Sequence, residues 1–302
     1  MRKVVVLGST GFVGRRLTQA LVQKGFGVRC SVRDPLKAAE ILPKECEIIP
    51  GDISDEKSMF DAVKGVEAVY VSIHTLRAQP KSMSGESFVD TEIRGLGYLV
   101  KACLDCGVGR IIYVTQLGAA PDAELLWARG RWKAEQLLLK SGLNATILRP
   151  GQIVGKGGGG FGRMMAQAGK RFAIVPGSGK QKYQNIAVDD LVYYLTQALD
   201  EPGTYGKAFD VGSDEILTYN EMIDIAARVM GKPAPIKIHL PLFLLKPFAP
   251  FLERAIKLPK GSFGDLIKGM ETDYTGDTQA IKAIIPYKLL NYEDAVGKVL
   301  KD

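Results

Sequence analysis

Histidine and cysteine, which build most transition-metal sites, are scarce in this sequence. The 302 residues include two histidines and four cysteines. A tetrahedral site needs four ligands, and the pair formed by Cys103 and Cys106 has no other cysteine or histidine nearby. We therefore expect no metal ion, and we expect reduced thiols that pack within a helix ending at Gly107.

Long apolar runs are also missing. The run from Val4 to Leu7 is too short for a signal peptide or a membrane span, so we expect a cytoplasmic protein. The most apolar stretch, HLPLFLLKPFAPFLERAI within residues 239–257, contains three prolines and cannot form one long helix. It is the core of a small lobe, the apolar wall of a substrate site, or a surface that touches a membrane.

Basic residues outnumber acidic ones, and the formal net charge is +7. A positive charge suits an anionic ligand, an acidic membrane surface or nucleic acid. The basic residues are scattered and no nucleic-acid motif is present, so we expect a phosphate-binding site and no nucleic-acid partner.

Short apolar runs alternate with helical patterns through the first half of the chain. The segments KVVVLG, GVRCSVR, CEIIPGD, VEAVYVSI, GRIIYVT and NATILRP are typical of buried strands. This alternation predicts an α/β fold with a doubly wound parallel sheet, the Rossmann fold. We expect a dinucleotide-binding domain over residues 1–155 and a smaller lobe, interleaved with it, over residues 156–302.

Three details of the second half follow from local sequence. The run GKGGGGFG after residue 154 indicates a flexible loop. The helix within QNIAVDDLVYYLTQAL is expected to be capped by Asp189 or Asp190, and to belong to the smaller lobe together with the strand at KAFDV. A later helix is expected to end at Gly231.

A glycine motif, GSTGFVG, follows the first strand and opens the first helix. Gly8 permits a tight turn, Gly11 lets the backbone approach a pyrophosphate, and Gly14 allows close packing of the helix. The helix N-terminus offers free N–H donors and a partial positive charge to the anion. The hydroxyl and backbone donors expected to assist come from Thr10, Phe12 and Val13.

The second strand ends in SVRDP, where the choice between NAD and NADP is made. An acidic side chain would accept hydrogen bonds from the ribose, and an arginine would meet a 2′-phosphate. Asp34 precedes a proline and favours a turn role, whereas Arg33 offers a bidentate fork that Arg15 and Lys37 could reinforce. We therefore predict NADP, with NAD as the second choice.

The third strand ends in PGDISD, beside the expected adenine. The carboxylate of Asp52 can accept from the exocyclic amine while Ile53 covers the ring. The alternative role for Asp52 is a turn or a helix cap, for which Asp55 is the better candidate.

Taken in order, these motifs resemble the extended and atypical short-chain dehydrogenase/reductase superfamily. The resemblance rests on GSTGFVG, VRDP, GDISD, GVGRIIYVT, WKAEQLLLKSGLNATILRPGQIVG, IAVDDL and FDVGSDEILTYNEM, and covers nearly the whole chain. The chain looks most like the NmrA-like and complex I accessory-subunit branch of NAD(P)-binding proteins. This resemblance specifies the fold and the cofactor far more narrowly than the reaction.

Catalytic members of that superfamily use a Ser or Thr, a Tyr and a Lys. Carried over by position, the Lys is Lys133, which would bind the nicotinamide ribose, but Arg129 replaces the Tyr and Gln116 replaces the Ser. Thr115 lies beside the Ser position and is placed at the cofactor. General acid catalysis contributes about two to four powers of ten in rate, so fast standard carbonyl reduction is not expected.

Arginine does not donate a proton at neutral pH, but Arg129 could bind an anionic group or stabilise an enolate. Arg131 is a second candidate, and the alternative for both arginines is a salt-bridged helix surface. His74, after the fourth strand, is a candidate substitute acid.

Two classes of function follow. The first is an NADPH-dependent oxidoreductase acting on a small apolar substrate such as a quinone, an isoprenoid or a conjugated carbonyl compound. The second is a non-catalytic NADP-binding protein, either a redox sensor of the NmrA kind or an accessory or assembly factor of a membrane complex, peripheral to the membrane. Epimerase or dehydratase activity ranks last, because it depends on the same Tyr.

Overall fold

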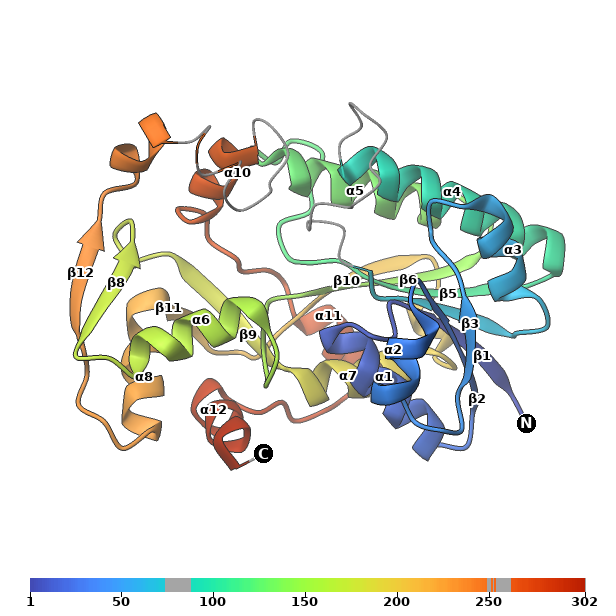
Figure 1. The fold of residues 1–302 in the computed structure, drawn as a ribbon, viewed down its shortest axis with the longest axis horizontal. Helices are drawn as coiled ribbons and strands as arrows, with labels where there is room; N and C mark the ends of the chain where they lie inside the picture. The colour runs from blue at the N-terminus through green and yellow to red at the C-terminus, as the bar shows by residue number, and fades with distance from the viewer. Residues whose placement is uncertain (74–87, 249–250, 252, 254–261, 302) are drawn as a thin grey trace.

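The large sheet consists of seven parallel strands in the order β10-β6-β5-β4-β1-β2-β3 (Figure 1). The computed structural model describes residues 1–73, 88–248, 251, 253 and 262–301. The six strands expected in the first half are all present, and the doubly wound α/β fold is confirmed. The strands are β1 (Lys3–Leu7), β2 (Gly27–Val32), β3 (Glu47–Pro50), β4 (Ala68–Val71), β5 (Arg110–Val114), β6 (Asn144–Pro150) and β10 (Lys207–Val211).

Helices cover both faces of this sheet. Along β1, Val4 and Val6 point into one buried cluster, whereas Val5 and Leu7 point into the other, as the period of two in a strand requires. The first cluster lies under α1 (Phe12–Gln23), α2 (Pro35–Ile41), α7 (Val188–Ala198) and α11 (Gln279–Ile284). The second lies under α3 (Glu56–Val63), α4 (Phe88–Cys106) and α5 (Leu126–Leu139).

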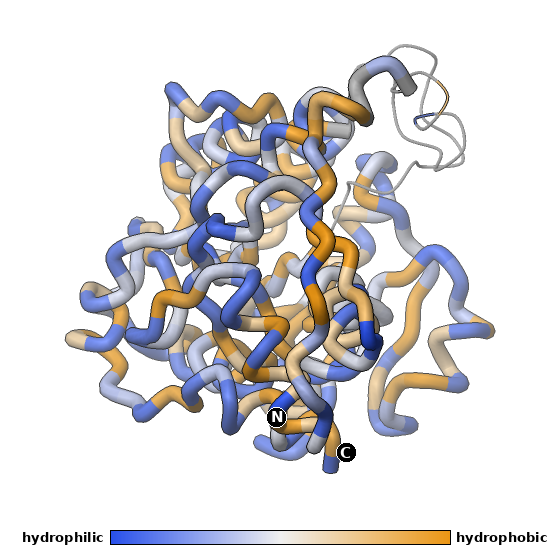
Figure 2. The backbone as a smooth tube through the Cα atoms, turned by 90° about the vertical axis from the view of Figure 1, so that its left-hand side faces the viewer, coloured by the Kyte–Doolittle hydropathy of each residue, from blue (hydrophilic) through white to orange (hydrophobic). Residues whose placement is uncertain are grey.

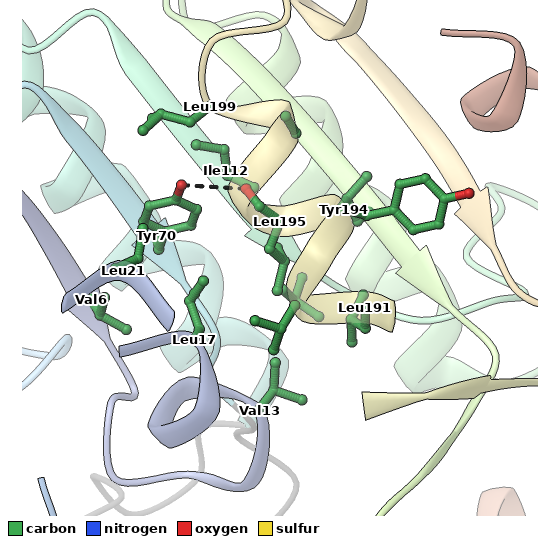
Figure 3. Packing of buried hydrophobic residues seen from close by; sticks show 14 of the residues in the cluster. Val6, Val13, Leu17, Leu21, Tyr70, Ile112, Leu191, Tyr194, Leu195 and Leu199 are labelled. Atoms are coloured by element: carbon green, nitrogen blue, oxygen red, sulfur yellow. Dashed lines mark hydrogen bonds between the residues drawn. The ribbon is translucent and has the colours of Figure 1, made fainter. Parts of the chain in front are cut away.

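Helix α7 packs directly against α1. Figure 3 shows Leu17 of α1 in one apolar cluster with Leu191 and Leu195 of α7, and the Tyr70 hydroxyl of β4 donates to the Leu195 carbonyl at 3.3 Å. Both α7 and β10 were expected in the smaller lobe, and the structure corrects this placement. Their apolar side chains complete the large sheet's core, so the second half of the chain helps to build the layers around the large sheet.

The smaller lobe has its own buried core. It contains a three-stranded sheet in the order β11-β9-β7 and a separate parallel pair, β12 and β8. Its elements are β7 (Gln152–Val154), β8 (Phe172–Pro176), β9 (Lys182–Ala187), β11 (Ile216–Thr218), β12 (Ile236–Leu240), α6 (Gly159–Ala168), α8 (Tyr219–Val229), α10 (Ser262–Gly269), α12 (Tyr292–Lys301) and η2 (Leu242–Phe248). The short helix η1 (Pro202–Thr204) connects α7 to β10 and lies against the large sheet, where the Thr204 carbonyl accepts from the Thr146 hydroxyl of β6 at 2.8 Å.

Several local predictions can now be compared with the structure. Helices α4 and α8 stop before Gly107 and Gly231, whose φ angles of 70° and 67° suit glycine, as predicted. The glycine run is not wholly a loop, because α6 begins within it at Gly159. Among the described residues, the proline-containing stretch is divided between the end of β12 and the short helix η2.

The expected aspartate cap of α7 is wrong. The cap residue is Ala187, and both aspartates lie in the first turn, where their charge still suits the helix N-terminus. Asp190 accepts a hydrogen bond from the Leu290 backbone at 2.9 Å, and Asp189 pairs with Lys298 at 2.5 Å. These carboxylates fasten the C-terminal segment to α7 instead of closing the helix end.

No helix within residues 1–73, 88–248 and 262–301 has the length and apolar character needed to cross a bilayer.

A buried polar cluster joins α4, β5 and α5. Arg131 forms an ion pair with Glu92 and donates to the Tyr113 hydroxyl at 2.9 Å, and that hydroxyl donates to Glu92. All three side chains are buried. Arg131 therefore belongs to a buried ion pair and not to the salt-bridged helix surface that was the alternative expected for it.

We predict that Glu92→Ala lowers the free energy of unfolding by about 3–5 kcal/mol, because it leaves the Arg131 charge buried without its carboxylate. Urea unfolding followed by circular dichroism measures the change. Glu56→Ala is the control, since Glu56 pairs with Lys101 on the exposed surface of the same helix layer. Equal unfolding midpoints for the two variants would contradict the buried pair's structural role.

Candidate dinucleotide and substrate site

The glycine loop lies where the strand order reverses between β1 and β4, which is the expected position of a ligand crevice. Gly8 has a φ of +87°, and a Cβ there would overlap the Ser72 carbonyl oxygen at the end of β4. A Cβ at Gly14 would overlap the Gly8 carbonyl oxygen. Backbone therefore packs on backbone at both positions, and neither accepts a side chain.

The N-terminus of α1 has no side-chain cap. Gly11 is the cap residue and supplies no side-chain cap, while its own N–H donates to the Gly8 carbonyl at 2.9 Å. Thr10 is exposed beside the loop, whereas the Val13 side chain is buried in the core, so only the backbone of Val13 can face a ligand. Uncapped N–H groups at a helix N-terminus fit a pyrophosphate.

Phe12 has a packing role that the sequence did not reveal. Its ring lies so close to Gly155 and Gly158 that a Cβ there would approach ring carbons to 2.9 and 3.1 Å. Arg16 stacks over the ring at 4.9 Å and donates to the Lys156 carbonyl at 2.8 Å. The glycine run thus makes room for Phe12, and joins the start of the smaller lobe to the glycine loop.

At the end of β2, the structure gives different surroundings to Arg33 and Asp34, the two candidates for contacting the adenosine ribose or its phosphate. Asp34 is the cap residue of α2, and its carboxylate accepts from the Lys37 backbone N–H at 3.1 Å, so a helix cap replaces the turn role expected for it. Arg33 is exposed, directly after the strand. Lys37 and Arg15 are also exposed.

Asp52 and Ile53 follow β3, on the side of the sheet covered by α3 and α4. The Asp52 carboxylate accepts from the Ser54 backbone at 2.9 Å and from its hydroxyl at 2.7 Å, which is a local turn. Asp55 caps α3 through Ser58, as predicted. Ile53 packs against α4, where a Cβ at Gly95 would approach it to 2.5 Å.

Helix α5 holds the positions of the missing tyrosine and of the lysine. Arg129 is half-buried and Lys133 is exposed, one turn apart and away from the buried stripe of the helix. The first turn is fixed from a distance, because Asp265 of α10 accepts from the Leu126 N–H at 2.9 Å. The smaller lobe therefore caps the helix that carries the candidate catalytic residues.

Stacked aromatic rings join the same turn of α5 to the smaller lobe. Trp127 stacks on Tyr274, with ring centroids 6.3 Å apart and planes 10° apart. Tyr274 stacks in turn on Tyr183 of β9, at 5.4 Å and 19°. This contact and the Asp265 cap keep α5 and the lobe in register.

A second polar network, which the sequence did not predict, holds the end of β5. The Thr115 hydroxyl donates to the buried Glu135 of α5 at 2.7 Å. Glu135 also pairs with Arg149 of β6, which lies 3.7 Å from Asp210 of β10. Burial raises the pKa of Asp210. The sequence did contain a sign of this network: Glu135 lies on the apolar stripe of a helix, and Arg149 lies within an apolar strand.

The hydroxyl hydrogen of Thr115 is therefore engaged, and Thr115 cannot readily take over the role of the missing serine. Gln116 occupies that position, and its amide Nε2 is buried with no hydrogen-bond partner among the described residues. Tyr113 offers no acid, because its hydroxyl is enclosed with Glu92 and burial raises its pKa. His74 lies outside the residues that the structure describes.

The sequence matches the NAD(P)H-binding family over residues 8–202, which is more than half of the chain. The protein belongs to this family. More fully, it is an atypical short-chain dehydrogenase/reductase with an NAD(P)-binding domain of the Rossmann type, as its motifs implied.

Relatives in other organisms differ in their described activities. The chain is 26% identical to subunit 9 of the mitochondrial NADH dehydrogenase (ubiquinone) 1 alpha subcomplex of Arabidopsis thaliana, over 95% of this chain and 75% of that protein. It is 26% identical to the NAD(P)H azoreductase of Xenophilus azovorans, over 76% and 74%. It is 30% identical to the photosystem II assembly factor Ycf39 of Cyanophora paradoxa, but over only 48% and 44%.

Solved structures share the fold. UDP-glucose 4-epimerase from Thermotoga maritima superposes with a TM-score of 0.74 at 17% identity, covering 99% of this chain and 97% of that one. UDP-glucuronic acid 4-epimerase from Bacillus cereus, in complex with UDP-glucuronic acid and NAD, gives 0.73 at 17%, covering 99% of each chain. At this identity the likeness establishes the fold alone.

We predict that Gly14→Ala weakens dinucleotide binding by more than about tenfold, or 1.4 kcal/mol, because the methyl group separates α1 from Gly8. Calorimetry with NADPH measures the affinity. Gly97→Ala is the matched control, since a Cβ at this α4 glycine meets no atom within 4 Å. Full affinity in Gly14→Ala would show that the close approach is not needed.

Proposed function

We propose that the protein is an NADPH-dependent oxidoreductase acting on a small apolar substrate, such as a quinone, an isoprenoid or a conjugated carbonyl compound. The observation that carries this proposal is the complete backbone cradle at Gly8 and Gly14, together with the cationic face formed by Arg129 and Lys133. The NAD(P)H azoreductase among the relatives supports a reductase.

NADP is favoured over NAD by the residues after β2. Asp34 is occupied as a helix cap, so it is not well placed to accept from the ribose hydroxyls, whereas Arg33 is exposed at the strand end. Its guanidinium can bind a 2′-phosphate through two parallel hydrogen bonds. Lys133 is proposed to bind the nicotinamide ribose, while Asp52 and Ile53 are proposed to contact the adenine.

When bound, the reduced dinucleotide supplies a hydride. Arg129 is proposed to stabilise the negative charge that then develops on the substrate oxygen, which needs no proton from the guanidinium. The unpartnered Gln116 Nε2 is proposed to donate a hydrogen bond to the same oxygen, because a buried amide donor costs about 1–3 kcal/mol until it is satisfied. Water or His74 would provide the proton after reduction.

A second candidate is a non-catalytic NADP-binding redox sensor, or an accessory or assembly factor of a membrane complex. It is favoured by the loss of both the serine and the tyrosine, at Gln116 and Arg129. The complex I subunit and the Ycf39 assembly factor among the relatives support it. A sensor would bind one redox form of the dinucleotide selectively and would not oxidise NADPH with any acceptor of a quinone and enone panel.

We predict that Arg33→Ala weakens NADPH binding by roughly tenfold to a hundredfold, which is the range for a lost hydrogen bond to a charged group. NADH binding should change little. Calorimetric titration of both nucleotides measures the difference, and Arg228→Ala controls for the loss of an exposed charge far along the chain. Equal losses for NADPH and NADH would refute the 2′-phosphate role.

We predict that Arg129→Ala lowers kcat/KM for NADPH oxidation by a quinone by about a hundredfold, similar to the removal of an oxyanion donor. NADPH affinity should stay the same, because Arg129 is proposed to touch the substrate. Arg129→Lys should recover part of the rate by restoring the charge. A rate unchanged in Arg129→Ala would place the chemistry elsewhere.

A further inference from the structure

The pair of strands β8 and β12 exposes an apolar face. The inward residues of β8, Ala173 and Val175, are fully buried in the core of the lobe. The outward positions hold two rows of apolar residues in register, and each of these residues is between 48% and 58% exposed. In this register Ile236 pairs with Phe172 and Ile238 with Ile174. A strand pair of this kind normally has a covering layer on each side.

The exposed apolar surface continues beyond β12. After Pro241 the chain enters η2, in which Phe243 is 64% exposed and Leu244 is 47% exposed. Figure 2 looks onto this side of the molecule, and its hydrophobic bands run along the two strands and upward into η2. We call Phe172, Ile174, Ile236, Ile238, Phe243 and Leu244 together the β8–β12 face.

The sequence around this face contains no acidic residue. Residues 170–180 and 232–248, 28 residues in all, include six lysines and arginines and no aspartate or glutamate. The remaining chain then has 34 basic and 33 acidic residues, from the totals of 40 and 33. Six of the seven net positive charges therefore come from the two segments that form the β8–β12 face.

Two of these six cations form contacts with other parts of the lobe. Lys237 pairs with Asp224 of α8 at 2.5 Å, and Lys232 donates to the Gly169 carbonyl at 3.1 Å. Lys170 and Arg171 are exposed, and the Arg171 guanidinium lies 5.4 Å above the Phe172 ring, at the edge of the apolar rows. Protein surfaces that bind anionic bilayers typically combine apolar side chains with cations at their border.

We propose that the β8–β12 face binds the surface of an anionic membrane. Its apolar side chains enter the boundary between headgroups and acyl chains, and the bordering cations contact anionic headgroups. A second copy of the chain is a poorer occupant, because two faces of the same positive charge would repel. This site is separate from the dinucleotide crevice and does not depend on the proposed reductase activity.

The test is flotation of the full-length protein with vesicles. Vesicles of phosphatidylcholine alone are compared with vesicles that also contain phosphatidylglycerol, at low and high salt. We expect binding to the anionic vesicles only, and weaker binding at high salt. Ile236→Ser with Ile238→Ser should weaken it by about tenfold, and Lys170→Glu with Arg171→Glu by more than about tenfold, since one cation contributes roughly fivefold.

The controls change equally exposed residues elsewhere. Leu36→Ser with Leu104→Ser removes two exposed apolar side chains from α2 and α4, and Lys64→Glu with Lys140→Glu reverses two exposed charges. Both controls should float like the wild type, and circular dichroism should show every variant folded. The proposal is overturned if anionic vesicles do not bind the wild type, if controls and face variants behave alike, or if light scattering reveals a dimer that the face variants dissociate.

Discussion

The contact between α1 and the first loop is the constraint on which the dinucleotide site depends. Gly14 lies against the Gly8 carbonyl, and Gly8 lies against the Ser72 carbonyl, with no space for a Cβ at either place. This packing brings the N-terminus of α1 to the carboxyl ends of β1 and β4. The same loop places the Phe12 ring against Gly155 and Gly158. These two positions of the glycine run are therefore also restricted to residues without a side chain.

The opposite wall of the site is fixed by buried charges. Arg131 is held by Glu92, and Glu135 is held by Arg149, one turn apart on the buried stripe of α5. Both pairs are polar groups within apolar layers, which are stable only while each charge keeps its partner. They fix the rotation of α5, and leave Arg129 on its unburied side. The identities of Arg129 and Gln116 separate this chain from the standard catalytic pattern.

The sequence was sufficient where the information is local. The consecutive valines of KVVVLG predicted a buried strand, and Asp55 was correctly predicted as a cap, because its carboxylate bonds within three residues. Asp34 also bonds within three residues, but it caps a helix and is not the turn residue that was expected. The sequence was not sufficient where two contacting residues or helices are far apart along the chain. The pairing of Glu135 with Arg149 and the position of α7 on α1 depend on which surfaces meet in space. Neither follows from periodicity. The sequence also predicted the wrong cap for α7, because Asp190 bonds to the backbone of Leu290, which is distant in sequence, and does not cap the helix.

The most direct test of the account is a parallel calorimetric titration of the wild-type protein with NADPH, NADP⁺, NADH and NAD⁺. The account predicts that both phosphorylated forms bind, and that each binds at least about tenfold more tightly than its unphosphorylated counterpart, a difference of 1.4 kcal/mol. Binding of only one redox form would favour the sensor over the reductase. Absence of binding by all four nucleotides would contradict the central claim that the glycine loop forms a dinucleotide site.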